Sequence, residues 1–153
     1  MDPPPATDPA PRRADQPAPP TQPSPSALFA GVLDEFAKIV GPEAARTTFH
    51  YASVQEGRRI ADVHGRDTVG ALAAVDAVIG SRSRILADEL SIVRIGIVNS
   101  TFLRAADQVR LGIMSGLLEG VLHATRGVPH HATWLPTEPG QERVLELRRT
   151  DMD

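Results

Sequence analysis

The chain has 153 residues, which is enough for one domain with a hydrophobic core. Its net charge of −3 and its pI near 5.9 argue against nucleic acid or an anionic membrane surface as a partner. The sequence contains no cysteine, which excludes disulfides, thiolate metal sites and a cysteine nucleophile. It shows neither a signal-peptide pattern nor an apolar run of the ~20 residues that a membrane span needs, so we expect a soluble, cytoplasmic protein.

The N-terminal region differs in composition from the rest of the chain. Residues 1–25 hold ten of the fourteen prolines and almost no large apolar side chains. Such a segment buries too little surface to offset its ordering entropy, so we predict a disordered, partly polyproline-II tail. A ligand for a proline-recognising module is the alternative. A single folded domain is then expected over residues 26–149, followed by a short tail at 150–153.

Three helices are predicted in the first half of this domain. Ser26 suits the N-cap of the first, which an apolar stripe marks over residues 27–40. The pair Gly41-Pro42 ends that helix and begins the second, because proline is favoured at the first helical position.

The second helix is predicted to run to Gly57 or to His64, with Gly57 as its end or as a kink. Asp67 suits the N-cap of the third helix, and Gly80 ends it.

The second half changes character. β-Branched residues that alternate with other types predict a strand within residues 90–98, and Asn99-Ser100 begins a turn. A glycine-bearing helix is predicted from Asp107 to about Arg126, and two strands around a proline–glycine turn follow it. The order of elements predicts an α+β fold, in which helices pack on a small antiparallel sheet.

The glycine-bearing helix is the least ordinary feature of the sequence. Gly112, Gly116 and Gly120 recur every four residues, although each interior glycine costs a helix roughly 0.5–1 kcal/mol relative to alanine. Glycines at this spacing share one helix face and let another group approach the backbone closely. Charged residues interrupt the segment, so we reject a membrane span. Two uses of this face remain, tight packing on the domain's own sheet and close contact with a partner or ligand. The glycine spacing alone does not distinguish them, and we favour packing on the sheet.

The stretch "IVNSTF" and the segment "LGIMSGLLEGVLHATRGVPHHATWLPTEPGQERVLEL" resemble the C-terminal half of 4-vinyl-reductase-type domains. That superfamily includes hydrocarbon-binding sensor domains of aromatic-responsive bacterial regulators and, more distantly, subunits of the TRAPP vesicle-tethering complex. The residues that match the pattern are Asn99, Ser100, Gly116, Gly120, Gly127 and Gly140. The upstream stretch "VGPEAARTTFHYASVQEGRR" resembles the early helices, so the resemblance covers residues 27–147 and implies a mixed helix and sheet fold.

The chain departs from the family at its cysteines. Leu111, Pro136 and Val144 stand approximately where the family often has them. In sensor members these cysteines are associated with a zinc site beside the ligand pocket, so the resemblance implies that this chain lacks that site.

Several residues are candidates for a ligand pocket or an interface. His50 and Tyr51 on the second helix, Trp134 on the penultimate strand and Leu111 are the candidate pocket residues, although each also suits an ordinary core or surface position. We predict a homodimer through the first two helices. Its predicted contact residues are Phe29, Leu33 and Phe36.

We expect neither a metal nor another cofactor. His130 and His131 are adjacent on a predicted strand, so their side chains point to opposite faces of the sheet. His123 lies near the end of the preceding helix, and the sequence shows no cluster of three or four ligands with the spacing of a zinc site. The sequence also lacks phosphate-binding glycine motifs and a serine-nucleophile elbow, so we predict that the protein is not an enzyme.

Three functions are considered, of which an enzyme or enzyme accessory, implied by the family's name, is disfavoured because the sequence shows no catalytic constellation. The favoured one is a regulatory or scaffold domain that acts through homodimerisation and an unidentified protein partner. The alternative is a sensor domain of the 4-vinyl-reductase type that binds a small apolar ligand. A ligand-binding domain should have a closed apolar cavity of a few hundred Å3, whereas an interaction domain should have a large exposed apolar patch.

Overall fold

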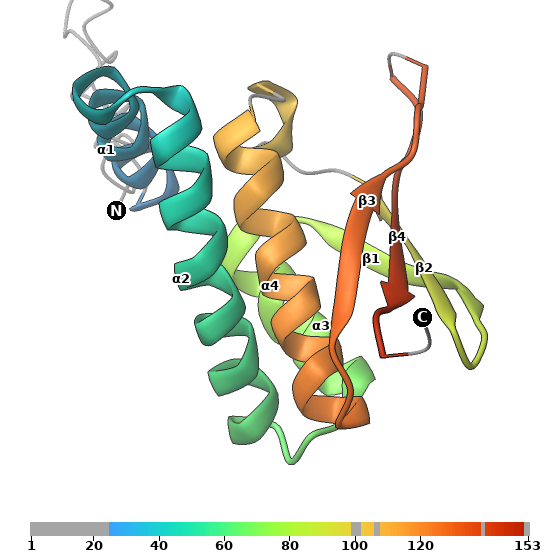
Figure 1. Ribbon diagram of the computed structural model, residues 1–153. Coiled ribbons are helices and arrows are strands. Elements are labelled where there is room, and N and C mark those ends of the chain that lie inside the picture. The colour runs from blue at the N-terminus through green and yellow to red at the C-terminus, as the bar shows by residue number, and fades with distance from the viewer. Residues whose placement is uncertain (1–24, 99–101, 106–107, 139, 152–153) are drawn as a thin grey trace, which may run out of the picture.

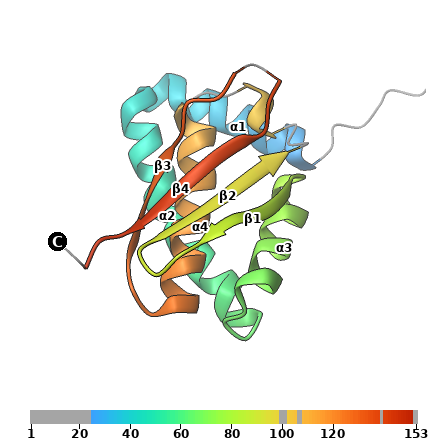
Figure 2. The same cartoon turned by 90° about the vertical axis from the view of Figure 1, so that its right-hand side faces the viewer.

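Helices lie on one side of a four-stranded antiparallel sheet in the computed structural model, which describes residues 25–98, 102–105, 108–138 and 140–151 (Figures 1 and 2). The predicted α+β fold is therefore confirmed. The elements are α1 (Pro25–Val40), α2 (Pro42–Val63), α3 (Thr68–Ile79), β1 (Arg82–Asp88), β2 (Ile92–Val98), the 3-10 turn η1 (Phe102–Ala105), α4 (Gln108–Arg126), β3 (His130–Trp134) and β4 (Arg143–Arg149).

The sheet has the order β1-β2-β4-β3, and every neighbouring pair is antiparallel (Figure 2). β2 and β4 are central, and their inward-facing residues are completely buried, among them Val93, Ile95, Leu145 and Leu147. The sequence analysis did not predict β1. This strand is at the sheet edge and its residues alternate between exposed and half-buried, so it lacks the run of large apolar residues that marks β2.

The predicted helix boundaries are confirmed in most cases. Asp67 caps α3 by accepting a hydrogen bond from the Gly70 amide at 2.8 Å, and Gly80 ends that helix in the left-handed conformation. One expectation is wrong, because Ser26 lies inside α1, which already includes Pro25. Of the two ends predicted for the second helix, His64 is confirmed: α2 continues past Gly57 to Val63, and His64 is its C-cap. The predicted tail at residues 1–24, the turn at Asn99-Ser100 and the helix start at Asp107 lie outside the described residues.

α4 is the central helix of the domain and is buried from Val109 to Leu122 except at Leu111, which is half-buried. It lies between α2 and the sheet (Figure 1). Because α4 is covered on both sides, its sequence is apolar on nearly every face. None of the described helices has the length and apolar character needed to span a lipid bilayer.

The glycines of α4 allow an unusually close approach of α2. A β-carbon added at Gly120 would lie 2.1 Å from the Val54 carbonyl oxygen, and one at Gly116 would lie 2.6 Å from the His50 carbonyl oxygen. On the other side of the contact, a β-carbon at Gly57 would lie 2.1 Å from the Leu117 carbonyl oxygen. The glycine face therefore packs on helix α2 rather than on the sheet, which corrects the packing interpretation made from the sequence.

Candidate functional site

An open groove of about 800 Å3 runs between α2, α4 and β3. It contains all four candidate pocket residues from the sequence, His50, Tyr51, Leu111 and Trp134. The remaining lining residues are Arg46, Thr47, Val54, Gln55, Arg58, Gln108, Gly112, Ser115, His131, Ala132 and Thr133. The groove is therefore not the closed apolar cavity expected of a ligand-binding domain. It is open to solvent, and polar side chains from α2, α4 and β3 line its wall.

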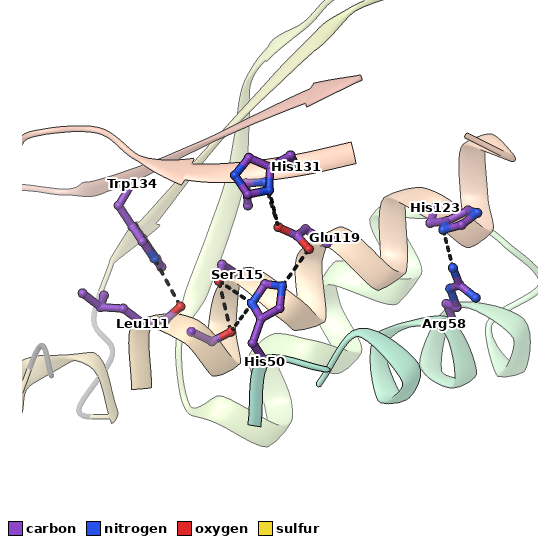
Figure 3. Close-up of polar contacts among 10 residues, drawn as sticks. His50, Arg58, Leu111, Ser115, Glu119, His123, His131 and Trp134 are labelled. Atoms are coloured by element: carbon purple, nitrogen blue, oxygen red, sulfur yellow. Dashed lines mark hydrogen bonds and ion pairs between the residues drawn. The ribbon is translucent and has the colours of Figure 1, made fainter. Parts of the chain in front are cut away.

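Glu119 is the buried centre of a polar cluster beneath this groove (Figure 3). It lies on α4 with 8% of its surface exposed, and one carboxylate oxygen accepts a hydrogen bond from the Ala132 amide of β3 at 2.8 Å. The other oxygen is 3.0 Å from Nε2 of His50 on α2. His131 Nδ1 is 3.7 Å from the first oxygen. One carboxylate thus connects α4 to both the helix and the strand that border the groove.

Ser115, His50 and Glu119 resemble a catalytic triad in composition but not in geometry. The Ser115 hydroxyl donates to the Gly112 carbonyl at 3.0 Å, whereas it is 3.4 Å from His50 Nδ1. Ser115 also lies in the middle of α4, where the backbone N–H groups are used within the helix and supply no oxyanion site. The arrangement therefore positions His50 rather than a nucleophile.

Trp134 fixes the end of β3 against the start of α4. Its indole Nε1 donates a hydrogen bond to the Leu111 carbonyl at 3.2 Å (Figure 3). The ring is half-buried against the core and also lines the groove. A buried indole N–H normally needs such an acceptor, so this contact explains how an amphipathic ring is held at the groove wall.

His123 contacts Arg58 of α2 and lies away from His131 (Figure 3). It lies 2.5 Å from a terminal nitrogen of Arg58, and both burial and the neighbouring guanidinium lower the pKa of His123. The imidazole is therefore neutral and accepts a hydrogen bond from Arg58. Burial also lowers the pKa of His130, whose Nδ1 donates to the Val128 carbonyl at 2.9 Å.

The two adjacent histidines lie on opposite sides of β3, since His130 is 6% exposed whereas the His131 side chain is 72% exposed. Across the described residues, no group of three histidine, aspartate or glutamate side chains is placed to hold a metal ion.

The three predicted dimer residues lie in different environments. Phe29 is 45% exposed and stacks on Phe102, with ring centroids 6.4 Å apart. Phe36 is half-buried and meets Phe49 edge to face. Leu33 is only 1% exposed, so the expectation that it belongs to a dimer surface is wrong: its side chain packs in the domain's own core.

Four residues of this site were not predicted from the sequence, namely Glu119, Ser115, Arg46 and Arg58. Glu119 interrupts an otherwise apolar stretch of α4, and a charged residue on a buried helix requires a polar partner. That signal could have identified Glu119. Its partners could not be found in the same way, because they come from α2 and β3, far away in the sequence.

Comparison with known proteins gives a structural match but no sequence match. No protein family matches the chain, and no curated protein matches it either. The chain is similar to the crystal structure of the phenol-responsive sensory domain of the transcription activator PoxR with phenol, with a TM-score of 0.62. The match covers 80% of this chain and 74% of that one at 18% sequence identity. This likeness shows that the two domains share a fold, and the neighbour is a sensory domain rather than an enzyme.

Proposed function

We propose that this protein is a non-catalytic regulatory domain that binds a small aromatic or apolar molecule in the groove between α2, α4 and β3. The observation that carries the proposal is the convergence of Trp134, Tyr51 and Leu111 with the His50–Glu119 pair on one groove. Small-molecule sites combine aromatic and apolar side chains with placed polar groups, and this groove combines both kinds although it is open and largely polar. The shared fold with a sensory domain supports the proposal, which was the alternative in the sequence analysis.

A ligand panel tests the proposal. We expect at least one of phenol, benzamide, benzyl alcohol and benzoate to bind, as measured by isothermal titration calorimetry and by the fluorescence of Trp134, the only tryptophan. Tyr51→Ala should weaken that binding by about 2- to 12-fold, which is the usual range for one aromatic contact. Tyr51 is 68% exposed, so its removal should leave folding unchanged.

Val78→Ala is the matched control, because Val78 is 70% exposed on α3 and does not line the groove. Absence of binding by every compound in the panel would contradict the proposed function. Equal effects of the Tyr51 and Val78 substitutions would place the ligand elsewhere.

A second candidate function, homodimerisation, is favoured by an apolar stripe on α1. Leu28, Val32 and Ile39 are 58%, 64% and 81% exposed. At 3.6 residues per turn they lie within about 40° of one another around the helix, on a side that also carries the exposed Glu35. Charged residues normally occupy such a solvent-facing side, so the stripe replaces Leu33 as the candidate dimer contact.

We expect the protein to be a dimer at micromolar concentration and Val32→Asp to convert it to a monomer, as measured by analytical ultracentrifugation. A charge buried in an apolar interface costs several kcal/mol, which is enough to dissociate a dimer of this kind. Val69→Asp is the control, because Val69 is 67% exposed on α3. A monomeric wild type, or a dimer that survives Val32→Asp, would contradict this assignment.

A further inference from the structure

The groove is positively charged although the protein as a whole is acidic. Arg46 and Arg58 line it, as do His50 and His131, whereas no described aspartate or glutamate contributes to its wall. The chain carries a net charge of −3. Cations gathered in a cleft of an acidic protein attract anionic ligands.

The arginines of the groove differ from most others in the described chain, because they have no carboxylate partner. The arginines that do form an ion pair with an aspartate or a glutamate are Arg59, Arg66, Arg84, Arg94, Arg110, Arg126, Arg148 and Arg149. Arg58 instead donates to the neutral ring of His123, and Arg46 has no ion pair among the described residues. Neither guanidinium group is therefore paired with a carboxylate of the described chain.

Glu119 carries a negative charge beneath the groove but does not line its wall. Its two carboxylate oxygens are already engaged by the Ala132 amide, by His50 and by the nearby His131. It is also 8% exposed, so it presents little of its negative charge to a ligand. An anion in the groove would meet positive charge without a competing carboxylate at its surface.

Arg46 is the better placed of the two arginines. Its side chain lies across Gly112, where an added β-carbon would be 3.2 Å from its Cγ atom. The neighbouring residue Leu111 accepts the hydrogen bond of Trp134, so Arg46 and the aromatic wall lie at the same end of the groove. Arg58 is twelve residues further along α2, about 18 Å at 1.5 Å per residue, and its guanidinium is already held by His123.

We propose that the groove selects organic carboxylates with an apolar or aromatic body, and that Arg46 binds the carboxylate while Trp134 and Leu111 contact the body. This inference rests on the proposed function and specifies its ligand class. A guanidinium can form two parallel hydrogen bonds to a carboxylate, which a neutral phenol or amide cannot accept in the same way.

Calorimetric titration with benzoate, phenol, benzamide and inorganic phosphate tests whether the groove selects carboxylates. We expect benzoate to bind at least tenfold more tightly than phenol or benzamide at the same pH and ionic strength, and inorganic phosphate to bind more weakly than benzoate. Comparable affinities for the neutral compounds would overturn the inference while leaving the proposed function intact. Phosphate binding as tight as that of benzoate would also overturn it, because the groove would then recognise charge without an apolar body.

Arg46→Gln tests the assigned residue. We expect it to weaken benzoate binding at least tenfold and to change phenol binding by less than twofold, with Arg46→Lys in between. Arg82→Gln is the matched control, because Arg82 has no ion pair among the described residues and does not line the groove. An unchanged benzoate affinity in Arg46→Gln would overturn the assignment. Arg46 is exposed, so the variant should fold, which circular dichroism would verify.

Discussion

Gly120→Ala should lower the free energy of unfolding by about 3 kcal/mol, the upper end of the usual cost of overpacking. The added β-carbon would lie 2.1 Å from the Val54 carbonyl oxygen and 2.9 Å from the Arg58 amide nitrogen. Both are backbone atoms of α2, so no flexible side chain can move aside. The two helices would have to separate, and the close contact between Gly57 of α2 and Leu117 of α4 would be lost with them.

Urea denaturation followed by circular dichroism measures this loss, and Gly31→Ala supplies the control. Gly31 is also inside a helix, yet nothing lies within 4 Å of an added β-carbon there. On helix propensity alone this second substitution should stabilise the protein by roughly 0.5–1 kcal/mol. Opposite signs for the same chemical change would show that the glycines of α4 serve the α2–α4 contact. A stable Gly120→Ala protein would contradict the close approach of these helices.

The sequence predicted those parts of the fold that local chemistry determines. Asp67 and Gly80 were correctly assigned as the boundaries of α3, because a side-chain cap and a left-handed glycine act on their immediate neighbours. The strand β2 was found because its buried residues Val93, Ile95 and Ile97 alternate along the chain. β1 was missed because its pairing with β2 holds it in the sheet, rather than any apolar pattern of its own.

The aromatic residues of the candidate site and His50 were predictable from the sequence, whereas Glu119 and the arginines of the site were not. Trp134 and Tyr51 were identified because large aromatic residues are rare in this chain. The partners of Glu119 come from two other elements, so their proximity depends on how α2 and β3 pack on α4. Leu33 shows the same limit, since the spacing of apolar residues on α1 does not reveal which of them turn inward.

Glu119→Ala should lower the free energy of unfolding by about 2–4 kcal/mol. The substitution removes the hydrogen-bond acceptor of the Ala132 amide and of the His50 ring, and water cannot replace it fully at this buried position. The Ala132 amide would lose its 2.8 Å hydrogen bond, and His50 would lose its 3.0 Å contact. Glu119→Gln should cost less, since its amide oxygen can still accept from Ala132 while its amino group faces His50.

Glu56→Ala is the matched control for this prediction. Glu56 also pairs with a basic side chain, Arg59, but its own side chain is 47% exposed, so removal should cost about 1 kcal/mol or less. Chemical denaturation gives the three stabilities, and hydrogen exchange of the Ala132 amide reports the local effect. Exchange should accelerate in Glu119→Ala and remain unchanged in Glu56→Ala. A loss of stability without faster exchange at Ala132 would mean that Glu119 holds α2 but not β3, and the strand would then be held by its pairing with β4 and by the Trp134 hydrogen bond.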